Sequence, residues 1–264
     1  MIMRTIRFRA ALAVLAAGVL TLGAVSTAAA TPLPNAPFGG WGKCPIANPE
    51  TSTCVDVVVK GGEMNINGLK VPIPSGSLNI AGGVAYRENP DAEFGFDQIF
   101  IPPNDGTKGV YSTPIEVPGG IFGLGIPFPG GLTTIKATVE PVALPTVDAF
   151  QLGVTLPARL KISNPLLGGN CYLGSASNPI MFKLGVTENG VLEEVPGFPD
   201  TAAVRNVKHA DQTFAVPGAS GCGLFGALNW AVNLRANVPS STGHNSLATT
   251  SDVFNIGADS LRTQ

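Results

Sequence analysis

The sequence predicts an all-β protein, either a β-sandwich or an open barrel of short antiparallel strands, with one short C-terminal helix. Runs rich in β-branched residues recur along the 264 residues and alternate with turn residues, as in such folds. Glycine (33) and proline (23) are abundant, yet 44% of the residues are hydrophobic. This combination favours a turn-rich folded protein over a disordered chain. No repeat of fixed length is visible, which disfavours a solenoid or a propeller.

Strands are expected wherever a run of β-branched or alternating apolar residues is bounded by turn residues. These segments are 54–60, 69–74, 77–86, 94–101, 110–117, 132–142, 149–163, 180–187, 201–208, 212–216 and 246–256. Gly61 and Gly62 are expected to end the first strand, and Pro72 and Pro74 mark the second as an edge or non-strand segment. The acidic, proline-bearing segment 191–200 is expected to be a connection.

The helix is expected within residues 222–235. Leu224, Leu228 and Ala231 recur there at helical spacing. Two glycines in the first turns lower the helix propensity of the segment, so only two or three turns are expected.

The first thirty residues have the pattern of a secretory signal peptide. Three arginines precede an apolar run at 10–25, and small residues follow it, so cleavage is expected after Ala30. Residues 31–42 are then expected to be a flexible segment, with Trp41 the first residue to dock. A single β domain is expected over 43–264, and a two-part division near residue 145 is the alternative. The protein is expected to be secreted.

Charge excludes several classes of partner. Charged residues make up 13% of the chain, and the first thirty residues contain three of the 16 basic and none of the 18 acidic residues. The remaining chain therefore has a net charge of −5 and no cluster of Lys or Arg. Neither nucleic acid nor an anionic membrane surface is an expected partner.

The four cysteines predict two disulfides, because an even number in an exported chain is typical of a disulfide framework. Three connectivities are possible. Cys44–Cys54 with Cys171–Cys222 is the favoured one, since the first pair closes a short loop and the second joins two glycine-rich loops. A zinc site is disfavoured because neither pair has C-x-x-C spacing.

No catalytic set is predicted, and no cofactor. Ser220 lies in a segment similar to a nucleophile elbow, with His209 and Asp211 as conceivable partners, but the flanking segments are not those of an α/β-hydrolase. Glycosidase chemistry needs two facing carboxylates, and nothing in the sequence pairs the scattered candidates. These are Glu93, Asp97, Glu116, Glu140, Glu193 and Glu194.

The densest acidic loop, 88–97, offers a weak calcium candidate. Asp91, Glu93 and Asp97 are hard-oxygen ligands of the type that Ca²⁺ prefers, although no EF-hand spacing is present. The alternative is a solvated acidic turn.

The segment 118–131 contains no charged residue and many glycines. Two interpretations are open: an exposed apolar contact loop for lipid or a partner, or a loop folded over the open end of the β domain. The residues that would make the contact are Ile121, Phe122, Leu124, Ile126 and Phe128.

The loop 164–180 is expected to be an ordered connection fastened by Cys171. Its residues Asn170-Cys-Tyr-Leu-Gly-Ser175, with Ser177-Asn-Pro-Ile180 and Gly221-Cys-Gly223, resemble a family of exported proteins of high-GC Gram-positive bacteria with an Asn-Cys-Tyr-Ile-Gly-Ser signature. Leu173 stands at the usual isoleucine. The resemblance covers roughly 139–256 and implies export and disulfides, but no catalytic residue.

These observations favour a secreted, non-catalytic structural or interaction module of the bacterial cell surface or its surroundings. A carrier of apolar or lipid ligands is the alternative, and a secreted hydrolase is less favoured. The expected partners are lipid, a cell-envelope component or another surface protein.

Overall fold

The computed structural model describes residues 41–121, 123, 129–196 and 198–263. The chain divides into two units, Met1–Thr31 and Pro32–Gln264, and all described residues belong to the second. The predicted signal peptide therefore lies outside the described residues, as does most of segment 31–42. Trp41 begins a short 3-10 helix, η1 (Trp41–Lys43), and is fully buried, as predicted.

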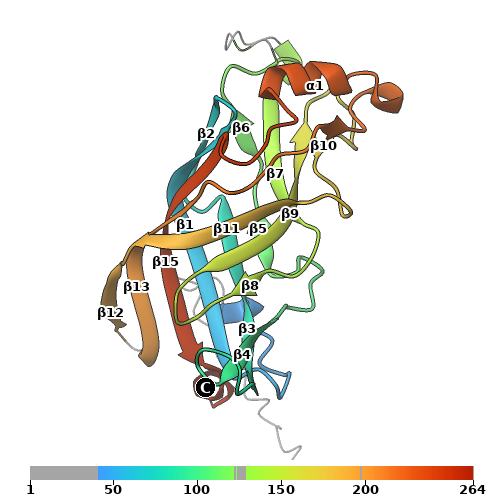
Figure 1. Cartoon of the computed structure of the whole chain (residues 1–264). Helices are drawn as coiled ribbons and strands as arrows, with labels where there is room; N and C mark the ends of the chain where they lie inside the picture. The colour runs from blue at the N-terminus through green and yellow to red at the C-terminus, as the bar shows by residue number, and fades with distance from the viewer. Residues whose placement is uncertain (1–40, 122, 124–128, 197, 264) are drawn as a thin grey trace, which may run out of the picture. The chain divides into compact units, whose positions relative to one another are not determined.

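In the described part of the chain, fifteen strands form one sheet (Figure 1). They are β1 (Thr53–Ile66), β2 (Leu69–Ile73), β3 (Leu78–Glu88), β4 (Phe96–Ile101), β5 (Val110–Ser112), β6 (Ile115–Val117), β7 (Ile135–Pro141), β8 (Thr146–Val147), β9 (Val154–Ser163), β10 (Tyr172–Leu173), β11 (Ile180–Glu188), β12 (Val191–Val195), β13 (Phe198–Asp211), β14 (Ala219–Ser220) and β15 (Asn245–Gly257). Their pairings are antiparallel. The all-β prediction is confirmed.

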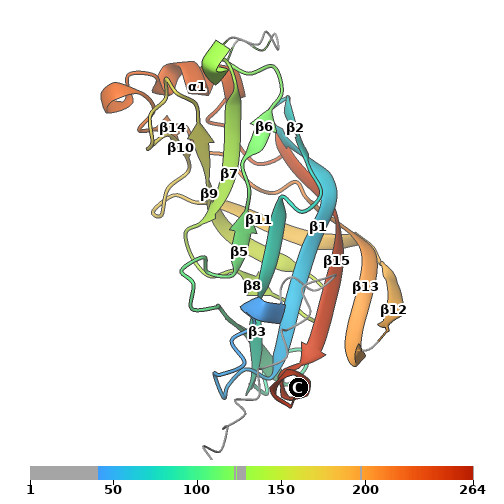
Figure 2. The same cartoon turned by 180° about the vertical axis from the view of Figure 1, so that it is seen from behind.

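The sheet is curled, with the main strand order β14-β10-β9-β11-β13-β15-β1-β3-β4 (Figures 1 and 2). β5 extends the sheet from β3, and β7 extends it from β9. β5 and β7 thus extend distant parts of the strand order, yet they contact each other. The backbone N–H of Val139 in β7 donates to the Oγ of Ser112 in β5, at 3.1 Å. The curl therefore encloses one apolar interior.

The alternation of buried and half-exposed side chains along the strands produces this interior. In β9, Val154, Leu156, Ala158, Leu160 and Ile162 are buried, whereas each intervening residue is half-exposed. Successive side chains of a strand point to opposite faces, so one face of β9 lines the core. β7 and β9 pair with each other although they lie on either side of residue 145.

The prediction that Gly61 and Gly62 end the first strand is wrong. β1 continues through both to Ile66, with one register shift against β15. A Cβ on Gly62 would lie 2.2 Å from the carbonyl oxygen of Ala248. The glycine therefore permits close approach of the two strands instead of ending one.

Other boundaries also differ from the predicted ones. Segment 191–200 is not an irregular connection but contains β12, which pairs with β13. Segment 212–216 forms no strand, only an isolated bridge between Val216 and Ser240. Segment 110–117 is split into β5 and β6. The proline-bearing segment 69–74 contains β2, which pairs with β1.

Two short helices lie at opposite ends of the sheet (Figure 1). The predicted helical segment contains a 3-10 turn, η3 (Leu224–Gly226), followed by α1 (Asn229–Ala236). The second helix, α2 (Ala258–Arg262), was not expected from the sequence. No helix among the described residues has both the length and the apolar character needed to cross a membrane.

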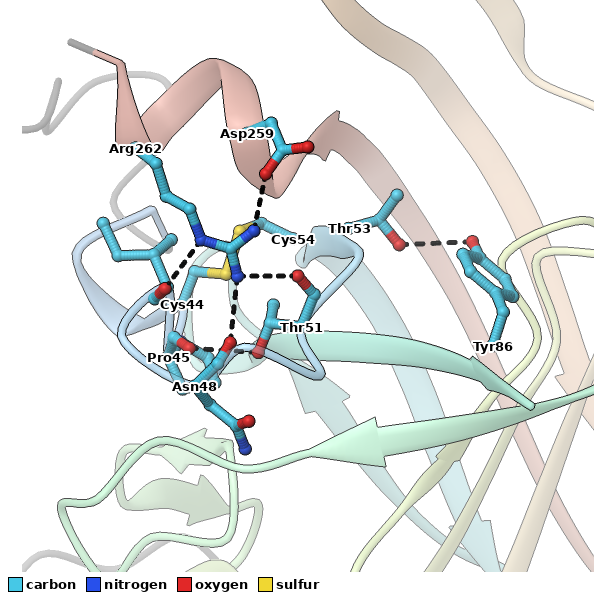
Figure 3. The surroundings of a disulfide bond; sticks show 10 residues. Cys44, Pro45, Asn48, Thr51, Thr53, Cys54, Tyr86, Asp259 and Arg262 are labelled. Atoms are coloured by element: carbon cyan, nitrogen blue, oxygen red, sulfur yellow. Dashed lines mark hydrogen bonds and ion pairs between the residues drawn. A yellow bond between two sulfur atoms is a disulfide. The ribbon is translucent and has the colours of Figure 1, made fainter.

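Both disulfides have the favoured connectivity, Cys44–Cys54 and Cys171–Cys222. The first lies beside Arg262 of α2 (Figure 3). The Arg262 guanidinium donates to the carbonyl oxygens of Ile46, Asn48 and Thr51, each at 2.9 Å. The loop closed by the disulfide is thereby fixed to α2.

Candidate apolar binding site

A cavity of about 180 Å³ lies inside the curled sheet, between the strands and α1. Aliphatic side chains of β1, β2, β6, β7, β9 and β10 form its walls. They include Met64, Ile66, Val71, Val117, Ile135, Ala137, Val139, Leu160, Ile162 and Leu173. Because almost every lining side chain is apolar, the cavity has little to offer a polar solute.

Helix α1 closes one side of the cavity with Leu228 at its N-cap and with Ala231, Val232 and Ala236. Two asparagines fix the helix to the segment before it, which contains β14 and Cys222. The Oδ1 of Asn229 accepts from the backbone N–H of Cys222, at 2.9 Å. The Oδ1 of Asn233 accepts from the backbone N–H of Ala219, at 2.7 Å.

Arg235 is the one charged residue that lines the cavity among the described residues. Its Nε donates to the carbonyl oxygen of Gly120, at 2.8 Å, and its Nη2 donates to the carbonyl oxygen of Pro118. Gly120 has a φ of 57°, and a Cβ there would lie 2.1 Å from the Thr133 carbonyl oxygen. Arg235 therefore links α1 to a loop whose backbone path requires glycine.

The loop 164–180 forms a further side of the site. Asn164 donates from Nδ2 to the carbonyl oxygens of Leu132 and Thr134, both at 2.9 Å. Leu166 and Leu167 follow it and line the cavity. The Cys171–Cys222 disulfide joins this loop to the segment that leads into α1. The predicted disulfide of Cys171 is therefore present, and its role as a tether of the loop stays a prediction.

A second, smaller cavity of about 40 Å³ continues the apolar interior. Met64, Ile73, Ile115 and Val139 line both cavities. The interior of the sheet therefore holds two adjoining spaces, the larger of them beside α1.

His209 lines the smaller cavity and is only 3% exposed. Its Nε2 donates to the carbonyl oxygen of Leu152, at 2.9 Å. Burial lowers the pKa of His209, and this outweighs the hydrogen bond to Leu152, which acts in the opposite direction. The imidazole is therefore neutral at neutral pH, as an apolar interior requires.

The conceivable hydrolase residues are not brought together. Ser220 is exposed on β14, whereas His209 and Asp211 are buried on β13. β13 lies four strands from β14 in the sheet order. Both carboxylate oxygens of Asp211 accept hydrogen bonds from neighbouring residues, Lys183 and Thr213. The arrangement lacks the contacts of a catalytic triad.

The calcium candidates have separate partners. Asp97 accepts a hydrogen bond from Asn89, at 3.0 Å, and Glu93 accepts one from Gln151, at 3.2 Å. The backbone N–H of Asp91 donates to the side chain of Asn89. The described residues contain no group of three or more His, Cys, Asp or Glu side chains placed to hold a metal ion.

Of the five residues of the predicted apolar contact loop, only Ile121 is described. It is half-buried and lines the large cavity. Phe122, Leu124, Ile126 and Phe128 lie outside the described residues, so the exposure of their side chains stays a prediction.

Sequence reasoning missed the role of α1. The helical spacing of Leu228 and Val232 indicates which face of the helix is buried. It does not indicate that this face closes a cavity. Comparison with models of protein families, with curated proteins and with solved structures found no match for this chain. The resemblance carried by the signature at 170–175 therefore stays a prediction.

Proposed function

We propose that the protein is a secreted, non-catalytic binding protein that holds an apolar chain, such as the acyl chain of a lipid, in the cavity beside α1. The observation that carries this proposal is the cavity of about 180 Å³ with an almost wholly aliphatic lining. Apolar cavities of about 150 Å³ stay dry and bind small apolar molecules.

The chemistry of the lining supports an apolar ligand. Burying a methylene group contributes about 0.8 kcal/mol, whereas a polar group without a partner would cost more than that. Among the described residues, those that line the larger cavity include no acid, histidine, serine or cysteine, so they supply no nucleophile or general base for a reaction in it. Retention of a chain is the activity that this set of side chains supports.

Secretion is part of the proposal. The signal pattern of the first thirty residues and the two disulfides support an extracellular or cell-envelope location, because disulfides persist in oxidising compartments. In that setting the protein acts as a binding module of the bacterial surface.

Cavity filling tests the proposal. Ala137 of β7 lines the cavity, and Ala202 of β13 is exposed outside it. The wild-type protein is expected to bind a fluorescent single-chain fatty-acid analogue, supplied below its micelle concentration, at one chain per protein. Ala137→Leu should weaken this binding at least about tenfold, and the matched control Ala202→Leu should leave it unchanged.

Two results would overturn the proposal. One is the absence of saturable binding by wild-type protein together with no lipid in solvent extracts of the protein from its native host. The other is equal affinity in Ala137→Leu and wild type. Ala231→Leu, which fills the same cavity from α1, serves as the test if Ala137→Leu does not fold.

A further inference from the structure

We infer that the outer face of η3 and α1, together with Leu166, is a docking surface for an uncharged lipid layer, from which the cavity receives its chain. This surface, the α1 face, consists of Leu166, Leu224, Phe225, Trp230 and Leu234. The inference rests on the proposed function and adds the source of the ligand.

The large apolar side chains of the α1 face are mostly exposed to solvent and are not packed into the core. The exposed fraction is 100% for Phe225, 77% for Leu224 and 76% for Leu234, and it is 66% for Trp230. An exposed cluster of this kind marks an interaction site more often than a free surface. Phe225 also has a φ of 52°, a conformation that is unfavourable for an aromatic residue.

Charge is absent from the three segments that meet at the α1 face. No charged residue lies between Glu116 and Lys136, between Lys161 and Lys183, or between Asp211 and Arg235.

Contacts within the structure hold these segments together. The Cys171–Cys222 disulfide joins the second to the third, and the backbone N–H of Gly223 donates to the carbonyl oxygen of Leu167, at 2.7 Å. Arg235 joins α1 to the first through the carbonyl oxygen of Gly120.

The exposed apolar pair on β12 lies beside charged residues. Val191 and Leu192 of β12 are 62% and 71% exposed, but Glu193 and Glu194 follow them directly. The α1 face has one charged neighbour in sequence, Arg235, which follows Leu234 and whose guanidinium donates to the carbonyl oxygens of Gly120 and Pro118. The residues of the face itself carry no charge for a protein partner or for anionic head groups. An uncharged apolar layer is the occupant whose chemistry fits this surface.

The α1 face is continuous with the cavity. Leu166 lines the cavity and is nevertheless 56% exposed, so the cavity lining reaches the surface at this residue. The opposite side of α1 lines the same cavity through Ala231 and Val232. A chain passing from a lipid layer into the cavity along this route would meet aliphatic side chains throughout.

The fluorescence of the two tryptophans can be used to measure vesicle binding. Trp41 is fully buried and Trp230 is 66% exposed, so only Trp230 is expected to respond to a change at the surface. Vesicles of neutral phosphatidylcholine should shift tryptophan emission of the protein to shorter wavelength and protect it from aqueous quenchers. The shift should be the same at low and high salt, because no charge takes part. Trp230→Phe should still bind vesicles in flotation assays but lose the shift.

A pair of double variants tests the surface. Trp230→Gln with Leu234→Gln should lower vesicle partitioning at least about tenfold, because each side chain buries a large apolar area. The matched control, Val191→Gln with Leu192→Gln, should partition as the wild type does. Binding of a dissolved single-chain analogue should be unchanged in both, since none of the four side chains lines the cavity.

The outcomes separate this inference from the proposed function. Wild-type protein that binds the dissolved analogue but no vesicles would overturn the lipid-docking inference alone. Vesicle binding that depends on anionic lipid would also overturn it. So would the combination of no vesicle binding with a wild-type dimer that the double substitution Trp230→Gln with Leu234→Gln dissociates. Ala137→Leu should bind vesicles normally, and loss of vesicle binding in that variant would count against a separate docking surface.

Discussion

Arg235 and Gly120 lie 115 positions apart in the chain, and the guanidinium Nε of one donates to the carbonyl oxygen of the other at 2.8 Å. This bond and its neighbour to Pro118 hold α1 against the loop after β6. The helix that closes the cavity is thus fixed by a residue that itself lines the cavity.

Arg235→Met should therefore loosen α1. The variant keeps the length of the side chain but loses two hydrogen bonds from a charged donor, each worth about 1.5–3 kcal/mol. Amide hydrogens of α1 are expected to exchange faster, and a bound chain should dissociate faster. Hydrogen exchange with mass spectrometry checks the first effect. Unchanged protection of α1 would contradict this role of Arg235.

Arg262→Met should lower the free energy of unfolding by about 2–4 kcal/mol, because three backbone carbonyl oxygens lose their charged donor. Chemical denaturation measures the change. Asp259→Asn is the control, since the Asp259 carboxylate is 93% exposed and its ion pair with Arg262 is expected to contribute little. Equal effects of the two substitutions would show that the carbonyl contacts are not what stabilises this end.

Loss of the Cys171–Cys222 disulfide should cost about 4 kcal/mol, and loss of Cys44–Cys54 about 3 kcal/mol, because the first closes the longer loop. The double variants Cys171→Ser with Cys222→Ser and Cys44→Ser with Cys54→Ser measure these costs without a free thiol. Thermal unfolding with and without reductant checks them. If the first variant melts as the wild type does, Cys171 does not tether the loop.

The free energy of unfolding should fall as the pH drops below 6.5, the ordinary pKa of histidine, in part because of His209. Burial lowers its pKa in the folded state. The unfolded state therefore binds a proton at higher pH than the folded state does, and acidification stabilises the unfolded state. The contribution is fully present above pH 6.5 and is lost as pH falls toward the folded-state value. His209→Gln should flatten this part of the stability profile, whereas His244→Gln, at an exposed site, should leave it in place.

Tyr111→Phe should raise the pKa of Asp105 from about 2 toward its ordinary value of 3.8. Burial alone would raise this pKa, but hydrogen bonds from Thr107 and Tyr111, with the charge of Lys43, outweigh burial and lower it. The Tyr111 hydroxyl donates to the carboxylate at 2.6 Å. Carboxyl chemical shifts during an acid titration measure the change, and an unaltered titration would exclude the hydrogen bond as a cause.

The strands are predictable where side-chain alternation alone decides the structure. The predicted segments 180–187 and 246–256 lie within β11 and β15, since their apolar residues recur at the strand period. The continuation of β1 through Gly62 is not predictable in this way. It depends on the close approach of Ala248, far away in sequence.

The candidate site is only partly predictable for the same reason. Leu228 and Ala231 are recognisable as helical from their spacing, and the favoured cysteine pairing proved correct. The cavity results from the curl of the sheet, which follows from the strand order and from contacts such as that between Ser112 and Val139. No local pattern in the sequence encodes such a contact.

The disulfide connectivity has a consequence for biosynthesis. Each cysteine pairs with its neighbour in the order of the sequence, Cys44 with Cys54 and Cys171 with Cys222. In a chain that enters an oxidising compartment with its N-terminus first, the first pair is complete before the third cysteine emerges. Oxidation in the order of emergence then yields the native pairing, and maturation has no need of an isomerase to reshuffle it.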